Sequence, residues 1–242
     1  MRHFGIIGYP LEQSFSAKYF NRKFAGEQID AEYSLYPIHA DEWQQDGGGK
    51  VKQLINTLDG MNVTLPYKQA VIPFLDSLDE TAKAIGAVNV VYKHIGYNTD
   101  CLGFMHSLKP LLRDYDRKAL VLGTGGASKA VCYGLKKSGI TPTLVSRTPM
   151  DGMLAYGQLD EKTMKEHTII VNCTPLGMYP DVDACPDIPY GLLTPKHLLF
   201  DCIYNPEETL FLKRGKAQGA TIKNGMEMLF GQAQAAWQIW NS

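Results

Sequence analysis

A glycine-rich turn is the first stretch of this sequence whose residue types and spacing could do chemistry. Residues 119–130 read ALVLGTGGASKA, with Gly123 and Gly125 at the first two glycine positions of G-x-G-x-x-G and Ser128 at the third. The first glycine permits a tight turn, the second lets the backbone approach a pyrophosphate, and the following helix presents free N–H groups. The glycine turn lies between a predicted apolar strand and a predicted helix, a position that favours dinucleotide binding. A turn that only links strand to helix remains the alternative.

The end of the next predicted strand indicates which dinucleotide binds. An NAD site normally carries an acid there for the ribose 2′-hydroxyl. This sequence instead reads LVSRT, with Ser146, Arg147 and Thr148 and no acid. A guanidinium beside two hydroxyls suits a 2′-phosphate, so the sequence predicts NADP unless Arg147 is only a solvated charge.

A second stretch, residues 60–68, ends an apolar strand with polar side chains and a lysine. It reads GMNVTLPYK, and Lys68 begins a helix predicted over about 67–75. A helix N-terminus disfavours a cation, so a lysine without a function is unexpected there. A positioned ammonium can attract developing negative charge and donate a proton, whereas an exposed surface lysine is the alternative.

Hydroxyl and carboxyl groups precede two other predicted helices. Ser14 and Ser16 lie just before a helix expected over 16–27, where two hydroxyls could bind a carboxylate. Ser16 is also a natural N-cap for that helix. Asp100 ends the stretch GYNTD and could cap a helix beginning at residue 101.

Alternating strands and helices are expected to position these residues. In the first part of the chain we expect strands over 3–8, 31–37 and 60–64, helices over 16–27, 50–58, 67–75 and 79–85, and a tight hairpin of 87–93 with 95–98. The order predicts a mostly parallel sheet with right-handed crossovers. In the second part we expect strands over 118–122, 142–146, 168–172 and 198–202, with helices over 101–113, 127–138 and 225–240.

Composition excludes several classes of protein. The 242 residues carry a net charge of −1 without a basic block, which disfavours a nucleic-acid partner. No run approaches the roughly 18 apolar residues of a membrane helix, and the first residues are too short a run for a signal segment. The five cysteines have no metal-ligand spacing, which favours a reduced, cytoplasmic chain without a metal centre.

Nine motifs, in order and nearly end to end, show that the sequence strongly resembles shikimate dehydrogenases. They are GYPLEQSFSAKYFN (8–21), GMNVTLPYK (60–68), GAVNV (86–90), GYNTDCLG (96–103), GTGGASKA (123–130), SRT (146–148), NCTPLGM (172–178), DCIYNPEET (201–209) and NGMEMLFGQA (224–233). The resemblance implies reversible, NADPH-dependent reduction of 3-dehydroshikimate to shikimate, in the shikimate pathway of chorismate and aromatic amino-acid biosynthesis. It implies an oxidoreductase that acts as a monomer or homodimer.

The resemblance also implies an α/β fold of two domains. Residues 1–100 plus 224–242 are expected to form a mostly parallel α/β substrate domain completed by the C-terminal helix. Residues 101–223 are expected to form a Rossmann-type NADP-binding domain, with the active site in the cleft.

The resemblance assigns roles residue by residue. The acid–base pair is Lys68 and Asp100. The substrate contacts are Ser14, Ser16, Thr64, Asn89, Tyr204 and Gln232. The cofactor contacts are Gly123, Gly125, Gly126, Ala127, Ser146, Arg147, Thr148, Thr174, Gly225 and Met228.

Three of these assignments have a structural alternative. Tyr204 could anchor a loop, Gln232 could face solvent, and Met228 could belong to the core. Asn62 receives no role beyond satisfying backbone groups at its strand end.

The sequence departs from the family pattern in three places. Ala-Lys-Tyr-Phe-Asn follows Ser16, the strand-end motif is SRT where NRT is usual, and the hairpin at 92–96 is short. The rival interpretations are a quinate/shikimate dehydrogenase that uses NAD and a non-catalytic NADP-sensing protein on the same fold. A Rossmann reductase for a folate or another acid does not explain the SFS and NVTLPYK motifs together.

Overall fold

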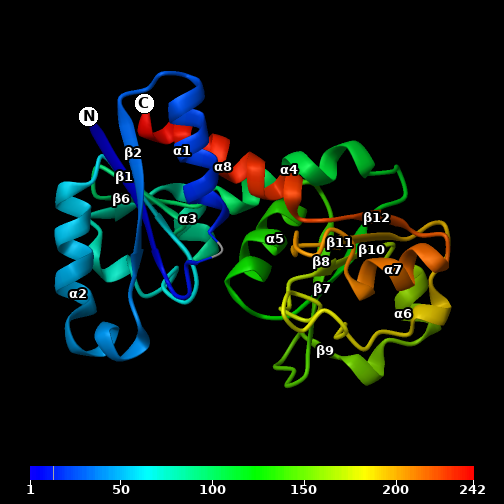
Figure 1. The fold of residues 1–242 in the computed structure, drawn as a ribbon. Helices are drawn as coiled ribbons and strands as arrows, with labels where there is room; N and C mark the ends of the chain where they lie inside the picture. Colours follow the sequence, from blue (N-terminus) through cyan, green and yellow to red (C-terminus); the bar gives the residue numbers. More distant parts are fainter. Residues whose placement is uncertain (13) are drawn as a thin grey trace. The chain divides into compact units, whose positions relative to one another are not determined.

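The computed structural model describes residues 1–12 and 14–242, which pack into two compact units. Unit 1 comprises Met1–Thr99 with Ala233–Ser242, and unit 2 comprises Asp100–Gln232. Each unit is an α/β structure around its own sheet (Figure 1), so the α/β class predicted from the sequence is confirmed. The assignment of substrate and cofactor domains to these units stays a prediction.

The sheet of unit 1 has six strands in the order β2-β1-β3-β5-β6-β4. They are β1 (Arg2–Gly8), β2 (Ala31–Pro37), β3 (Gly60–Val63), β4 (Ser77–Leu78), β5 (Val90–Tyr92) and β6 (Ile95–Tyr97). β1 pairs in parallel with β2 and β3, and β5 runs antiparallel to both of its neighbours. Lys93 and His94 both adopt φ above 0° between β5 and β6, as a two-residue type I′ turn requires, so the predicted tight hairpin is confirmed.

Helices cover both faces of this sheet. They are α1 (Phe15–Gly26), α2 (Ala40–Thr57), α3 (Glu80–Ile85), the short 3-10 helix η1 (Ile72–Phe74) and the last residues of α8 (Met226–Trp240). Figure 1 shows α1 and α2 on opposite sides of the sheet. Phe4 and Ile6 of β1 pack with α1 and α8, whereas Ile7 packs with α2 and α3. Burial on both faces explains why β1 reads as a nearly continuous apolar run.

Unit 2 arranges six parallel strands in the order β12-β11-β10-β7-β8-β9. They are β7 (Lys118–Leu122), β8 (Thr141–Ser146), β9 (Leu154–Ala155), β10 (Ile169–Asn172), β11 (Leu198–Asp201) and β12 (Thr221–Lys223). Numbered from β7, this is the order 3-2-1-4-5-6 of Rossmann-type dinucleotide-binding domains.

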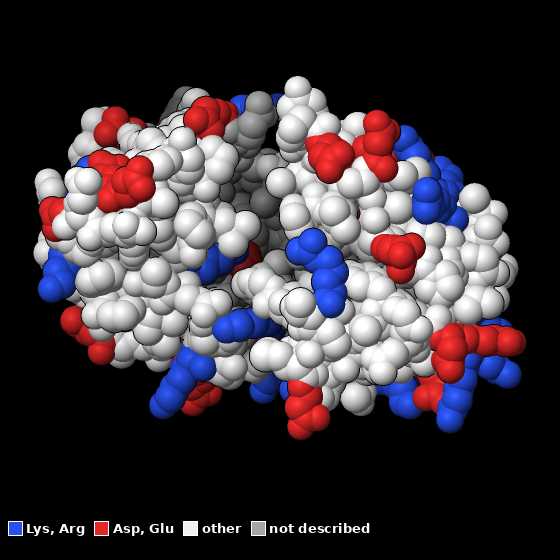
Figure 2. All heavy atoms as spheres, turned by 90° about the horizontal axis from the view of Figure 1, so that it is seen from below, with Lys and Arg blue, Asp and Glu red and all other residues white. Residues whose placement is uncertain are grey.

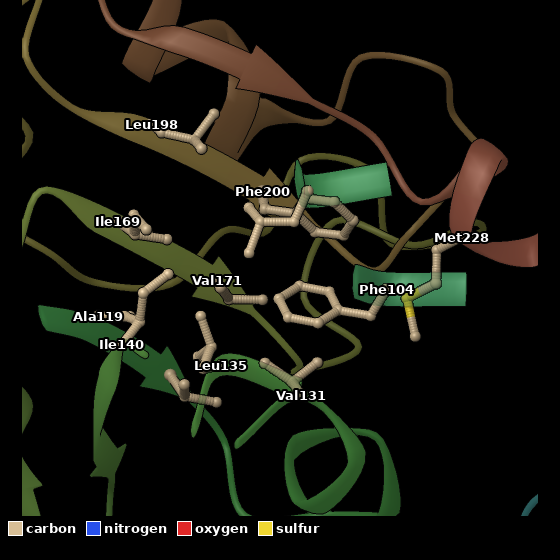
Figure 3. Packing of buried hydrophobic residues seen from close by; sticks show 12 residues of the cluster. Phe104, Ala119, Val131, Leu135, Ile140, Ile169, Val171, Leu198, Phe200 and Met228 are labelled. Carbon is tan, nitrogen blue, oxygen red and sulfur yellow. The ribbon is translucent and has the colours of Figure 1, made fainter. Parts of the chain in front are cut away.

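The helices of unit 2 enclose this sheet. They are α4 (Asp100–Leu108), α5 (Gly126–Lys137), α6 (Glu161–Glu166), α7 (Leu210–Ala217), the first residues of α8, and the 3-10 helices η2 (Lys109–Leu111), η3 (Tyr156–Gln158) and η4 (Tyr190–Leu192). Phe104 of α4, Phe200 of β11 and Met228 of α8 meet in one buried cluster, shown in Figure 3. The Phe104 and Phe200 rings lie edge to face, with centroids 5.0 Å apart.

One helix prediction for the first half of the chain is wrong, and a second predicted helix is longer than expected. Residues 65–71 form turns and only Ile72–Phe74 is a 3-10 helix, so no α-helix covers 67–75. Pro73 lies inside the expected span and lacks the N–H that a continued α-helix needs. The helix expected over 50–58 begins at Ala40, because His39 and Glu42 form a capping box there. Its kink at Asp46 precedes glycines that lie against the rings of Trp43 and Phe74, where a side chain would clash.

Charged residues of both signs are interspersed over the face of the molecule drawn in Figure 2. The mixture agrees with the net charge of −1. Among the helices of the described residues, none combines the length and apolar character that crossing a bilayer requires.

An aromatic cluster holds the C-terminal helix on the sheet of unit 1. The Trp240 ring stacks on Phe4 with centroids 4.9 Å apart and lies 5.1 Å from Phe20. Its indole N–H donates to the Val91 carbonyl at 3.3 Å. A side chain at Gly60 would overlap the Trp240 ring, so the glycine that opens β3 is required by this close approach.

We predict that Trp240→Ala lowers the free energy of unfolding by about 3–5 kcal/mol, because it empties a fully buried site. Urea unfolding followed by circular dichroism measures this change. Gln238→Ala, on the exposed face of the same helix, is the matched control and should change stability by less than about 0.5 kcal/mol. Equal losses for the two variants would show that the cluster does not hold the helix.

Candidate active site

The predicted substrate residues of unit 1 gather at one edge of its sheet. β1 and β3 run in parallel, so the segment that leads from β1 to Ser14 and the start of α1 leaves the sheet at the same edge as Thr64, the residue after β3. The Val63 N–H donates to the Asn89 carbonyl at 2.9 Å, which places Asn89 beside Thr64 although β5 runs the other way. A side chain at Gly8 would overlap the Thr64 methyl, so this glycine allows the two strand ends to meet.

Lys68 lies half-buried in the turn that follows Thr64. Its neighbour Tyr67 fixes the turn, because the Tyr67 ring stacks on Trp43 with centroids 4.0 Å apart. The Tyr67 hydroxyl also donates to the Ile38 carbonyl at 2.7 Å. The Lys68 carbonyl accepts the Val88 N–H at 2.7 Å. Contacts on both sides therefore hold the backbone of Lys68 in place.

Asn89 forms hydrogen bonds with Thr99, the residue that precedes α4. Its Oδ1 accepts the Thr99 N–H at 2.7 Å, and its Nδ2 donates to the Thr99 hydroxyl at 3.0 Å. Asp100 follows directly as the first residue of α4 and is buried. These two hydrogen bonds between Asn89 and Thr99 fix the backbone from which the Asp100 side chain projects. The pairing of Asp100 with Lys68 stays a prediction.

The two serines differ in their local roles. Ser14 caps α1 by accepting the Ala17 N–H at 3.5 Å, so the expectation that Ser16 is the N-cap is wrong. Ser16 lies inside the first turn of α1 and is buried. Gln13, which precedes the pair, lies outside the described residues.

In unit 2 the glycine turn lies at the carboxyl end of β7. Gly123 adopts φ of +101°, which favours glycine, and Gly125 is the N-cap of the 12-residue helix α5. Apart from its own chain neighbours, no atom of the described residues lies within 4 Å of a Cβ built on Gly125, which leaves its backbone accessible to a pyrophosphate. Ser128 stands at the third glycine position of the motif, and its hydroxyl donates a hydrogen bond to the Gly125 carbonyl at 2.7 Å. Gly126 and Ala127 open the helix, so these residues fit a dinucleotide.

The strand-end motif Ser146-Arg147-Thr148 follows β8, beside the glycine turn. The Ser146 hydroxyl accepts the Thr148 N–H at 3.2 Å and closes the turn. Arg147 and Thr148 are exposed, which leaves the guanidinium accessible to a phosphate. The positive charge of Arg147 lowers the pKa of Tyr156, although burial has the larger effect and raises that pKa overall.

A buried network that the sequence did not reveal holds Thr174 at the end of β10. The Thr174 N–H and hydroxyl both donate to Asn172 Oδ1, at 3.0 and 2.7 Å. Asn172 Nδ2 donates to Asp201 Oδ1 at 3.0 Å, and Asp201 also accepts from the Ile203 N–H and the Thr209 hydroxyl. Gly123 lies against the Thr174 methyl, so the network supports the glycine turn.

The remaining predicted residues differ in their surroundings. Tyr204 is half-buried, and burial raises its pKa. Gln232 is buried and donates to the Leu229 carbonyl at 3.1 Å, so its solvent-facing alternative is wrong. Gly225 packs against the Cys202 carbonyl, where a side chain would clash. Met228 belongs to the core cluster of unit 2, and the nicotinamide contact predicted for it stays a prediction.

The described cysteines offer little nucleophilic chemistry in this part of unit 2. Cys173 and Cys202 follow neighbouring strands, with their sulfurs 3.7 Å apart. The hydrogen bond to Cys202 and burial raise the pKa of the Cys173 thiol well above its ordinary value, so it stays protonated at neutral pH. Within residues 1–12 and 14–242, no three His, Cys, Asp or Glu side chains gather in a group that could hold a metal ion.

Comparisons with known proteins agree with this arrangement. Residues 6–91 match the family model of the shikimate dehydrogenase substrate-binding domain. The chain is 37% identical to the NADP(+) shikimate dehydrogenase of Desulforamulus reducens, covering 98% of this chain and 88% of that protein. It is 39% identical to the enzyme of the same name from Clostridium beijerinckii, covering 99% and 92%.

The solved structures that match this chain are also shikimate dehydrogenases. The Thermus thermophilus shikimate 5-dehydrogenase, in complex with NADP(H) and shikimate, matches with a TM-score of 0.87 and 29% identity. That match covers 99% of this chain and 93% of the other. The Aquifex aeolicus shikimate dehydrogenase matches with a TM-score of 0.86 and 35% identity, covering 100% and 92%.

We predict that Asp201 makes stability fall as the pH rises. Burial raises the pKa of Asp201 to about 6, so between about pH 4 and 6 the folded state holds this proton more tightly than the unfolded state. The stabilisation is fully present below pH 4 and is lost as the pH passes 6. Asp201→Asn removes the titration, so the unfolding free energy of the wild type relative to this variant should fall by about 2–3 kcal/mol between pH 4 and 7.

Urea unfolding of both proteins across this pH range measures the difference. A difference that does not change with pH would show that the Asp201 carboxyl titrates normally in the folded protein.

Proposed function

The chain belongs to the shikimate dehydrogenase family, and we propose that it catalyses the reversible, NADPH-dependent reduction of 3-dehydroshikimate to shikimate. One observation carries the proposal. Lys68, Thr64, Asn89 and the serine pair converge on one sheet edge of unit 1, in a chain whose second sheet bears a dinucleotide turn at β7. The relatives named as NADP(+) shikimate dehydrogenases cover nearly the whole chain, which supports the same activity here.

The Lys68 side chain can supply the positive charge and the proton that the carbonyl oxygen of the substrate needs when it is reduced. The hydride comes from the nicotinamide of bound NADPH. As the carbonyl oxygen of the substrate gains negative charge, the Lys68 ammonium attracts it and donates a proton. In the reverse direction the neutral amine accepts that proton. The Asp100 carboxylate, as its partner, keeps the lysine charged and oriented before the reaction.

The other polar groups bind the substrate. Ser14 and Ser16 take its carboxylate, since both lie at the start of α1, where the helix dipole favours an anion. Thr64 and Asn89 bind ring hydroxyls. Tyr204 and Gln232 complete the proposed contacts.

The chain's own groups also suit the cofactor. The backbone of Gly123, Gly125, Gly126 and Ala127 holds the pyrophosphate, and Arg147 with Ser146 and Thr148 holds the 2′-phosphate. Thr174, Gly225 and Met228 are proposed to line the nicotinamide side. The enzyme is proposed to work in the cytoplasm, where its cysteines stay reduced, as a monomer or homodimer.

An initial-rate assay tests the function. Purified protein receives shikimate or quinate with NADP⁺ or NAD⁺, and the near-ultraviolet absorbance of the reduced cofactor is followed. The proposal expects the highest kcat/KM with shikimate and NADP⁺. A preference for quinate and NAD⁺ would favour the quinate/shikimate rival, and cofactor binding without turnover of either acid would favour the sensor.

We predict that Lys68→Ala lowers kcat by roughly 10²–10⁴-fold while the shikimate affinity stays within about tenfold, because the proton donor is lost and the other contacts remain. Steady-state kinetics and shikimate titration measure the two effects. Lys52→Ala, an exposed lysine on α2 of the same unit, is the control and should match the wild type. A Lys68→Ala variant of normal rate would remove this lysine from the chemistry.

We predict that Arg147→Ala weakens NADPH binding by about 1.5–3 kcal/mol and barely changes NADH binding, because only NADPH carries the 2′-phosphate. Fluorescence titration with each cofactor measures the losses. Arg117→Ala, an exposed arginine of unit 2, is the control and should leave both affinities unchanged. Equal losses for the two cofactors would show that Arg147 does not bind the phosphate.

A further inference from the structure

A chain of buried polar groups crosses the sheet of unit 1 behind the proposed substrate residues. The Tyr33 hydroxyl on β2 donates to Asn62 Oδ1 on β3 at 2.6 Å. Asn62 Nδ2 donates in turn to the Asn89 carbonyl at 3.1 Å, which confirms that Asn62 satisfies a backbone group. Tyr33, Asn62 and Asn89 are each less than 5% exposed, so solvent does not compete for these bonds.

The Asn89 carbonyl fixes the direction of every bond in this chain. A carbonyl can only accept, so the amide nitrogen of Asn62 faces it and the amide oxygen faces Tyr33. The Tyr33 hydroxyl must therefore donate to Asn62, which leaves its oxygen to accept from another group.

The Tyr33 hydroxyl is not needed to fill space. Its ring stacks on Phe20 with centroids 4.9 Å apart and lies 6.4 Å from the Trp240 ring, contacts that a phenylalanine ring makes equally well. Asn21 holds the backbone of Tyr33 by pairing with both its N–H and its carbonyl. A buried hydroxyl in an apolar cluster costs stability unless it is hydrogen-bonded, so its contribution here lies in the groups it orients.

We infer that Tyr33, acting through Asn62, is a positioning residue for Asn89, the proposed ligand of a substrate ring hydroxyl. This inference rests on the proposed function. The Tyr33 hydroxyl holds the Asn62 amide in the orientation that donates to the Asn89 carbonyl, and this bond helps to fix the backbone from which the Asn89 side chain projects.

Tyr33→Phe tests the inference. Loss of the hydroxyl leaves the buried Asn62 Oδ1 without its donor and lets the Asn62 amide turn away from the Asn89 carbonyl, so the KM for shikimate should rise about 5–10-fold. The kcat should stay within about twofold, and the KM for NADP⁺ should not change. Tyr92→Phe, which removes an exposed hydroxyl bonded to the Ser242 carbonyl in the same unit, is the matched control and should leave all three constants unchanged.

The double variant Asn62→Ala/Tyr33→Phe separates positioning from general destabilisation. If Tyr33 acts through Asn62, adding Tyr33→Phe to Asn62→Ala raises the KM for shikimate by less than about twofold. An unchanged KM in Tyr33→Phe, or losses that multiply in the double variant, would overturn the inference. A wild-type protein that does not oxidise shikimate would instead refute the proposed function, which is a different and earlier outcome of the same assay.

Discussion

Burial of the central strands on both faces is the constraint on which the rest of the structure depends. β1, β3, β7 and β10 each place nearly all of their side chains in a core. Polar side chains can then meet solvent or a ligand only where these strands end. Thr64, the glycine turn and Thr174 all follow the last residue of such a strand, and the parallel pairing brings those ends together within each sheet.

The few polar groups that remain inside are used to hold strand ends in place. In unit 1 Asn62 joins Tyr33 to the Asn89 carbonyl, and in unit 2 Asn172 joins Asp201 to Thr174. Both asparagines connect a side chain of another strand to a residue of the proposed site. Because an amide carries a donor and an acceptor at a fixed angle, each one sets the direction of the bonds on both sides.

The local sequence was enough to predict those site residues whose position depends on a single turn at the end of a strand. The glycine turn, the strand-end arginine and the strand before Lys68 follow from spacing and residue type. The roles of Tyr33 and Asp201 could not be predicted in this way, because their hydrogen-bond partners lie on other strands and only the strand register of the folded sheet shows the pairing. The helix expected after Pro66 failed for a related reason, since Tyr67 is held by Trp43 and Ile38 from another element rather than by helical bonds.

The most direct test of the central claim follows the transferred hydrogen itself. Shikimate labelled with deuterium at C3 is incubated with the protein and NADP⁺, and the reduced cofactor is examined by NMR. The account predicts deuterium at C4 of the nicotinamide ring together with 3-dehydroshikimate as product. Reduced cofactor without deuterium, or no reduced cofactor from shikimate, would contradict it.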